Sequence, residues 1–414
     1  MSSSTSLSSP SRFTPELNED TLAFVAVAIL LSGVVLWSSH LSGVEKTDFS
    51  LTYVAARIVH RGQEPLLYDM ELQKKTRDSL FIHPSPLFFE HPPLEALLLS
   101  PLAALSFRSA YAVWGLLNAA VWLSLIIFLR RYLPWPRELL AYIALWLIFA
   151  PLAVALYQGQ SSIILLALFA AAFVLLKNAR ELSAGLALGF GLIKFQFVLP
   201  FVLVFVLLRK WRFLAGFILA ASVFVALSIA TVGFKGMAHY LGFLLTIAAN
   251  PQNQSYGSAV DMPTIQGFLY AFLGDRIPHT GLITASLLLS VLLLVWIARQ
   301  WRLATSQSSS DLLFGSAIAA SLLAGSHMFT HDLSPLLFSM LLILAHFDGA
   351  NAKVRVLLVF TMAVFWTFPL YFLCVAYHCL YLMCPVLVLF VFAAVQMAKT
   401  VEKNRVVEAG YLKA

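Results

Sequence analysis

The sequence has few charged residues. Asp, Glu, Lys and Arg make up 11% of its 414 residues, whereas hydrophobic residues make up 60%. A soluble globular domain is about 25% charged, so this composition excludes that class and indicates a polytopic membrane protein. The alternating apolar and polar strand pattern of outer-membrane barrels is also lacking. The predicted fold class is therefore an all-α polytopic membrane protein.

Cysteine is scarce. Cys374, Cys379 and Cys384 are five residues apart, a spacing that scatters them around a helix, so we prefer a packing role to a metal site with His378. Basic residues exceed acidic ones, 27 against 20, which gives a net charge of +7. They lie mostly in short links between apolar runs, so we interpret them as topology signals and expect no nucleic-acid partner.

No Arg- or Lys-rich head and no clear cleavage site accompany the first apolar run. Residues 1–20 are expected to be a disordered cytosolic tail, and residues 21–38 an uncleaved first span. Windows of membrane length predict about twelve helical spans. These are residues 21–38, 94–107, 110–129, 138–156, 161–177, 183–208, 213–233, 280–298, 311–326, 330–347, 353–371 and 373–397.

The predicted topology places both chain ends in the cytosol, with residues 21–398 as one membrane domain and residues 399–414 as a second tail. Basic links in the C-terminal half fall on the inner side, as the positive-inside rule requires. Two versions of the N-terminal half remain open. Either residues 94–107 cross the membrane, or they only dip into it and residues 183–208 form a hairpin broken near Lys194.

Two outer segments, residues 39–93 and 234–279, are too long to be simple connectors. The first contains FSLTYVAARIVH, in which Phe49, Tyr53 and Ala56 share one helix face while Arg57 and Arg61 share another. That pattern predicts a helix lying in the membrane interface. We find no repeat between the two halves of the chain, which disfavours a transporter built from inverted repeats.

Short motifs recur along the chain in an order that resembles a known family, the polytopic glycosyltransferases of family 87 in the C superfamily, which uses polyprenyl-phosphate sugars. The resemblance covers roughly residues 20–345 and implies transfer of a sugar, such as mannose, to a lipid or glycan acceptor at the outer face of the cell membrane. His91 replaces the usual Tyr, and an insertion follows residues 253–255. The residues that carry the resemblance are Asp48, Phe49, Tyr53, Ala55, Ala56, Gly62, Tyr68, Asp69, Pro92, Pro93, Leu94, Gly159, Gln160, Lys194, His331, Asp332 and Leu333.

The chemistry of such an enzyme needs few groups. A polyprenyl phosphate is a good leaving group, so inversion at the sugar carbon needs one carboxylate as general base and positive charge around the phosphate. Asp48 is the expected base, and the alternative is that it caps a helix. Lys194 lies in an apolar run, where an unpaired charge costs on the order of 3 kcal/mol or more. We expect it to bind phosphate, and the alternative is snorkelling to an interface.

Other candidates surround these two. Arg57 and Arg61 are expected either to join the phosphate clamp or to face lipid headgroups. His327 and His331 are four residues apart beside Asp332, and we expect them to bind phosphate or sugar unless they belong to a capped helix start. No cofactor or metal is expected, because the cations can replace it. Further expected substrate-binding residues are Tyr53, His91, Gln160, Asn253, Gln254 and Asp332, with Glu90 and Glu95 as rival bases.

Two functions of another class compete with the glycosyltransferase. A secondary transporter or lipid flippase would also contain many spans and a buried lysine, but it should place ionisable groups at the midplane of two related halves. A scaffold subunit without catalysis would tolerate Asp48→Asn.

Overall fold

The computed structural model describes residues 19–82, 85–133, 138–249 and 259–411, and these segments contain helices and no strands. The α-helices are α1 Glu19–Ser38, α2 Asp48–His60, α3 Met70–Leu80, α4 Pro93–Leu99, α5 Phe107–Leu129, α6 Leu139–Leu147, α7 Ala150–Gln158, α8 Ser162–Lys177, α9 Glu181–Gly189, α10 Phe195–Leu207, α11 Trp211–Ala249, α12 Ile265–Leu273, α13 His279–Leu303, α14 Gln307–Leu323, α15 Ser334–Ala345, α16 Ala352–Trp366, α17 Phe368–Ala376 and α18 Met383–Tyr411. Three short 3-10 helices matter for the site: η3 Ser100–Ala104, η4 Phe190–Lys194 and η7 Thr330–Leu333.

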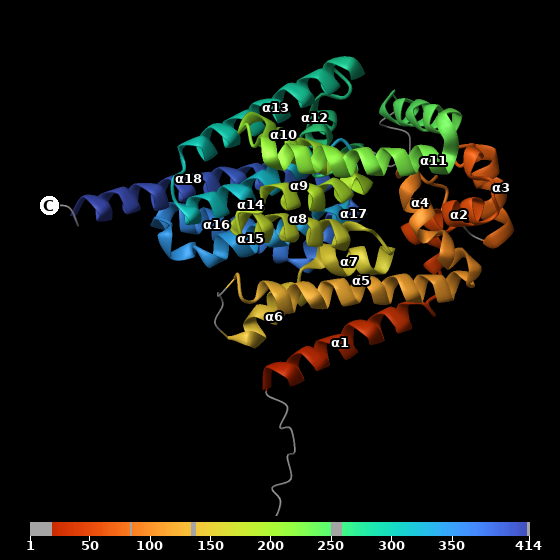
Figure 1. The fold of residues 1–414 in the computed structure, drawn as a ribbon, viewed down its shortest axis with the longest axis horizontal. Helices are drawn as coiled ribbons and strands as arrows, with labels where there is room; N and C mark the ends of the chain where they lie inside the picture. Colours follow the sequence, from red (N-terminus) through yellow and green to blue (C-terminus); the bar gives the residue numbers. More distant parts are fainter. Residues whose placement is uncertain (1–18, 83–84, 134–137, 250–258, 412–414) are drawn as a thin grey trace, which may run out of the picture.

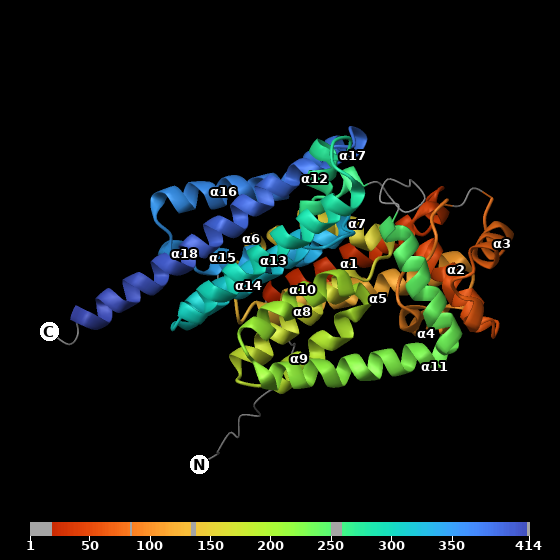
Figure 2. The same ribbon diagram turned by 90° about the horizontal axis from the view of Figure 1, so that it is seen from above.

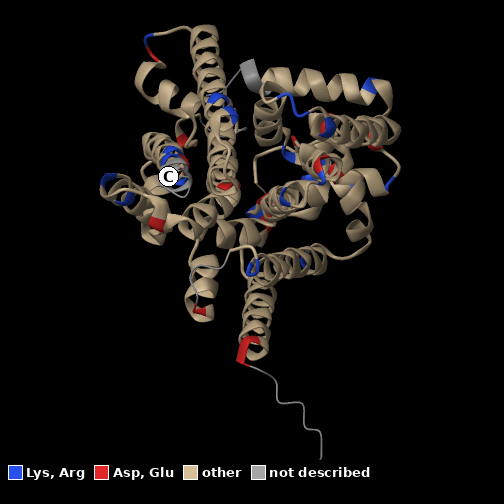
Figure 3. Ribbon diagram, turned by 60° about the vertical axis from the view of Figure 1, so that its left-hand side comes forward, with Lys and Arg blue, Asp and Glu red and all other residues tan. Residues whose placement is uncertain are grey.

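The long helices run in roughly the same direction and form one bundle (Figure 1). Helices α2, α3 and α4 gather at one end of the bundle, and the last turns of α18 project from the opposite end, as both ribbon views show (Figures 1 and 2). Charged residues are sparse along the helices, most of whose length is uncharged (Figure 3). These observations confirm the predicted fold class, an all-helical membrane protein.

The number of membrane crossings is bounded by helix length. Six helices of the described residues are long and apolar enough to cross, and bent pairs raise this number to eight. The pairs are α6 with α7, bent by 54°, and α16 with α17, bent by 65°. Three further apolar segments, residues 93–104, 162–177 and 330–345, are shorter than a full span. Twelve crossings therefore stay a prediction.

Several predicted boundaries differ from the structure. Residues 94–107 form α4 followed by η3, which together are too short for a span. Residues 183–208 belong to one candidate span, Glu181–Leu207, which η4 interrupts without folding it into a hairpin. The last predicted spans meet at residues 371–373, whereas α17 continues to Ala376. A hydropathy window records apolar length but not bends, so it misplaces these boundaries.

Close packing of small residues joins the central helices. Gly185 of α9 lies so near α11 that a Cβ atom added to it would be 1.9 Å from the carbonyl oxygen of Phe213. Small residues allow such approach in membranes, where van der Waals contact replaces the hydrophobic effect between helices. This close contact fixes the part of the bundle that carries η4.

Residues 39–82 and 85–93 form a small subdomain, here called the cap, with its own aromatic core. Phe49, Tyr53 and Ala56 of α2 are all buried, as the predicted helix face requires. Phe49 packs against Tyr111 of α5 with ring centroids 5.7 Å apart, and Tyr68 packs against Tyr240 at 4.6 Å. The cap is therefore fixed to the bundle, and it sets the position of Asp48. A membrane-interface location for α2 stays a prediction.

Candidate active site

Asp48 is the first residue of α2 and points away from the helix it begins. The preceding residue, Thr47, is extended, and no side chain caps this helix. The Asp48 backbone N–H donates to Gln158 Oε1 at 3.0 Å, and its carboxylate Oδ2 accepts from Gln160 Nε2 at 2.8 Å. The side chain is 24% exposed. Capping therefore does not explain this carboxylate, which remains accessible.

Gln160 occupies a tight turn between α7 and α8. The turn requires Gly159, whose φ of +66° is left-handed and whose added Cβ would lie 2.7 Å from Phe49 Cβ. The indole N–H of Trp114 donates to the Gly159 carbonyl at 2.7 Å, which anchors the turn to α5. Gln160 then bridges two charges, because its Nε2 donates to Asp48 while its Oε1 accepts from Lys194 Nζ at 2.8 Å.

Lys194 ends η4, where the interrupted helix directs its side chain into the protein. The side chain is 3% exposed, and Nζ forms an ion pair with Asp332 Oδ1 at 2.7 Å. An ammonium group has three donors, and the contacts to Gln160 and Asp332 use two of them. The lysine is thus paired within the protein and does not extend to an interface.

Asp332 and His331 lie on η7, close to Asp48. Asp332 Oδ1 also accepts from Ser162 Oγ at 3.0 Å, and Oδ2 accepts from the Phe329 backbone N–H at 3.1 Å. The His331 ring stands between two carboxylates: Nδ1 is 3.7 Å from Asp48 Oδ2, and Nε2 is 3.3 Å from Asp332 Oδ2. Asp332 therefore caps a helix start and also takes part in the charge network.

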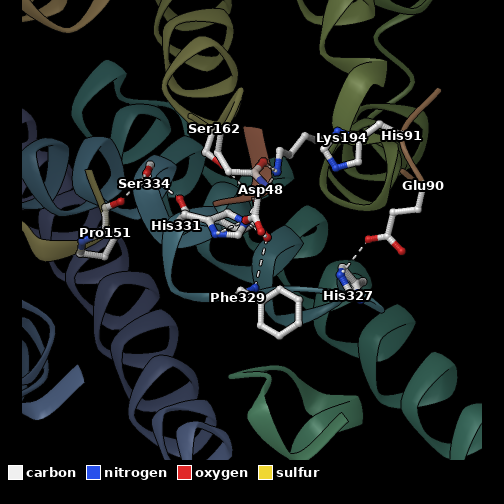
Figure 4. A network of polar contacts seen from close by, with 12 residues as sticks. Asp48, Glu90, His91, Pro151, Ser162, Lys194, His327, Phe329, His331 and Ser334 are labelled. Atoms are coloured by element: carbon white, nitrogen blue, oxygen red, sulfur yellow. Dashed lines mark hydrogen bonds and ion pairs between the residues drawn. The ribbon is translucent and has the colours of Figure 1, made fainter. Parts of the chain in front are cut away.

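These groups line one pocket of the described residues, with an empty space of about 580 Å³ that includes its open mouth. Figure 4 shows Asp48 beside His331, with Lys194 and His91 on one side. The structure thus brings together residues from five separate segments of the chain. The lining residues are Asp48, Leu51, Thr52, Leu87, Phe88, Phe89, Glu90, His91, Gln160, Lys194, Gln196, His327, Phe329, His331 and Asp332.

Two histidine–carboxylate pairs complete the wall formed by the 85–92 segment. His327 Nε2 is 3.0 Å from Glu90 Oε1, and His91 Nδ1 contacts Glu95 Oε2. Burial opposes the charge on Glu90, but His327, His91 and Lys194 together outweigh burial and lower the pKa of this carboxyl. Burial likewise opposes the charge on His327, but Glu90 and Asp332 together outweigh burial and raise the pKa of the imidazole. The Glu90–His327 pair therefore holds charge inside the pocket.

Some expected site residues lie elsewhere. The Tyr53 hydroxyl donates to the Leu105 carbonyl at 2.7 Å, and Arg57 Nη1 donates to the Ala103 carbonyl at 2.6 Å. Neither residue lines the pocket, because both side chains point from α2 toward η3 and the residue that follows it. Residues 253–255, with Asn253 and Gln254, lie outside the described residues.

Ser162, Gln158 and Gln196 also belong to this site and were not predicted from the sequence. Gln158 precedes Gly159, Ser162 follows Gln160 by two residues, and Gln196 follows Lys194 by two residues. Polar residues next to a recognised motif inside an apolar run were the available signal. Among the described residues, no group of three or more His, Cys, Asp and Glu side chains is arranged to hold a metal ion.

Comparison with known proteins identifies the family. The model of glycosyltransferase family 87 matches residues 88–330. No curated protein and no solved structure matches the chain. The matched segment supplies the pocket wall with Glu90, the turn with Gln160 and the broken helix with Lys194. Since it covers more than half of the sequence, this chain belongs to glycosyltransferase family 87, a family of membrane glycosyltransferases.

Proposed function

We propose that the protein transfers one sugar, mannose by family resemblance, from a polyprenyl phosphate to a lipid or glycan acceptor, with inversion at the sugar carbon. The observation that supports this most directly is the bridge made by Gln160. Two hydrogen bonds of 2.8 Å and one amide place Asp48 Oδ2 within about 8 Å of Lys194 Nζ. Both groups also line the same pocket, from which a base and a phosphate ligand can reach one sugar carbon.

In the proposed step, an acceptor hydroxyl attacks the anomeric carbon and passes its proton to Asp48. The bond from that carbon to the phosphate oxygen breaks, and the leaving polyprenyl phosphate carries the electron pair. The third N–H donor of Lys194 and an N–H of the His331 ring stabilise the negative charge that forms. The ammonium of Lys194 supplies charge that a metal would otherwise provide. Because Asp48 and His331 lie outside the family match, their roles rest on geometry.

We further propose that the end of the bundle with α2, α3 and α4 faces outward across the cell membrane. Lys399, Lys403 and Arg405 lie on the part of α18 at the opposite end, which the positive-inside rule assigns to the cytosol. The start of α1 lies on that same side of the bundle (Figure 1), so the number of crossings is even. Both eight and the predicted twelve satisfy this condition.

The test uses the purified protein in detergent with labelled polyprenyl-phosphate mannose and a membrane lipid extract. We expect a labelled product and free polyprenyl phosphate. Asp48→Asn keeps the side-chain shape but removes the base, so the rate should fall by a factor of about 10² to 10⁴ while the protein stays folded. Asp69→Asn, which alters only the cap of α3, is the matched control and should remain active. If the protein transferred sugar only from nucleotide sugars, a polyprenyl-phosphate sugar as the donor would be refuted.

A further inference from the structure

The ion pair between Glu90 and His327 lies in the same pocket as Asp48 but belongs to a different wall. The two residues are far apart in sequence, and neither is in a helix. Figure 4 shows the pair to one side of the Asp48 and His331 side chains. Each side chain is 23% exposed, so the pair faces the pocket instead of being sealed inside the core.

The protein holds Glu90 firmly from both sides. The Phe89 backbone N–H donates to the buried Gln73 Oε1 at 2.9 Å, and the Tyr68 hydroxyl donates to the His91 carbonyl at 2.8 Å. The backbone before and after Glu90 is therefore fixed to the cap. Groups that recognise a ligand need this kind of support, because a loose side chain loses entropy when it binds.

His327 is oriented in a similar way. Its ring stands edge-on to Phe329, with centroids 4.7 Å apart and an angle of 90° between the planes. The Phe329 backbone is in turn held by Asp332. The plane of the imidazole is thereby set by the same aspartate that pairs with Lys194, which ties this wall of the pocket to the phosphate-binding residues.

Each member of the pair has one polar atom left for a ligand. His327 Nε2 and Glu90 Oε1 face each other, and among the described residues no hydrogen bond is recorded for His327 Nδ1 or Glu90 Oε2. A protonated imidazole donates and a carboxylate accepts. His327 Nδ1 lies across the ring from the nitrogen that faces Glu90, so the two free atoms can contact different hydroxyl groups of one sugar, each of which donates and accepts.

The charge of the pair also selects the part of the substrate that it contacts. An imidazolium beside a carboxylate is neutral overall, so it gives a phosphate no net attraction. Lys194 retains a free N–H donor for the anionic group. The neutral pair is therefore suited to the uncharged, hydroxyl-rich part of a sugar phosphate.

We propose that Glu90 and His327 form a hydroxyl-binding subsite for the transferred sugar, with Glu90 Oε2 accepting from one hydroxyl and His327 Nδ1 donating to another. This inference rests on the proposed function, because it takes the sugar of a polyprenyl phosphate donor as the ligand. It makes both residues determinants of which sugar is transferred, while the base remains Asp48.

The experiment uses polyprenyl-phosphate mannose and a set of deoxy analogues, each lacking one sugar hydroxyl. For the unmodified protein, removal of the hydroxyl that Glu90 binds should lower kcat/KM by about tenfold to a hundredfold, the usual range for a hydrogen bond to a charged group. Glu90→Gln should lower kcat/KM for the complete donor by a similar factor. It should cause little further loss with the sensitive analogue, because the contact is already absent.

The controls distinguish a hydroxyl-binding role of the Glu90–His327 pair from a purely structural role, and failure of the subsite from failure of the proposed function. Glu71→Gln, at an exposed position of α3, should leave kcat/KM unchanged for every donor. If the losses from Glu90→Gln and from the missing hydroxyl multiply independently, the contact does not exist. If the unmodified protein transfers all analogues equally well, the subsite is refuted whether or not the variants fold. If it transfers none of the donors, the proposed function fails and the subsite fails with it.

Discussion

The Lys194–Asp332 ion pair can be tested separately for its contribution to the stability of the protein and for its role in sugar transfer. The two side chains are only 3% and 2% exposed, so water cannot solvate either charge if its partner is removed. Breaking a buried pair costs about 3–5 kcal/mol, whereas replacing both partners by neutral groups costs far less. We therefore expect Asp332→Asn to destabilise the protein strongly and Lys194→Met/Asp332→Asn to recover most of that loss.

The two single variants should differ from each other. Asp332→Asn leaves the ammonium of Lys194 with Gln160 as its remaining partner, and it also presents an amide N–H₂ to donors that the carboxylate accepted from. Lys194→Met leaves the carboxylate of Asp332 with Ser162 Oγ, the Phe329 N–H and the His331 ring. Because several donors remain, Lys194→Met should be the milder change. The double variant should nevertheless be inactive, since it lacks the proposed phosphate ligand Lys194.

The assay compares thermal unfolding midpoints in one detergent with initial rates of sugar transfer. Lys74→Met/Asp78→Asn is the matched control, because that ion pair on α3 is 56% and 44% exposed and solvent screens it, so its loss should leave the unfolding midpoint nearly unchanged. A double variant at Lys194 and Asp332 that is as unstable as the sum of its single changes would show that the charges are not coupled. A stable double variant with full activity would remove Lys194 from the proposed mechanism.

Two further predictions concern the turn and the second wall of the pocket. Gly159→Ala combines a φ of +66° with a Cβ placed 2.7 Å from Phe49 Cβ, so it should lower the free energy of unfolding by about 1–3 kcal/mol and slow sugar transfer. Gly33→Ala is the control: nothing lies within 4 Å of the added Cβ, so this change should not lower the unfolding midpoint. The lowered pKa of Glu90 adds stability that is lost as pH falls through that pKa, and the raised pKa of His327 adds stability that is lost as pH rises through it. The difference in unfolding midpoint between the unmodified protein and Glu90→Gln should therefore be largest between about pH 5 and pH 6.5 and become smaller at higher pH. A difference that does not change with pH would show that Glu90 and His327 do not form a charged pair.

The long helices could be predicted from sequence because each is an uninterrupted apolar run. The predicted span 110–129 lies within α5, Phe107–Leu129, and the predicted span 280–298 lies within α13, His279–Leu303. Bends could not be predicted in this way. The break between α6 and α7 and the short α4 depend on how neighbouring helices pack, and hydropathy does not record packing.

The same contrast holds for the site. Asp48, Lys194 and Asp332 stand out in the sequence because an ionisable residue in or beside an apolar run costs free energy unless it is paired or solvated, and such residues are candidates for a functional site. Their pairing does not stand out. The ion pair between Glu90 and His327 joins distant segments, and a single sequence contains no signal for such a contact. Arg57 shows the converse, because its spacing suited a phosphate clamp but the fold directs it to a backbone carbonyl.

The arrangement around Gln160 explains how a protein with so few charges can build a reaction centre. An amide between a carboxylate and an ammonium has only one favourable orientation, with N–H toward Asp48 and oxygen toward Lys194. The left-handed turn at Gly159 fixes where that amide stands. The proposed base and the proposed phosphate ligand are thus held apart by a planar group of fixed size. A buried ion pair is weak evidence of stability, so the retention of Lys194 and Asp332 beside this amide is better explained by the positioning of charge before the substrate binds.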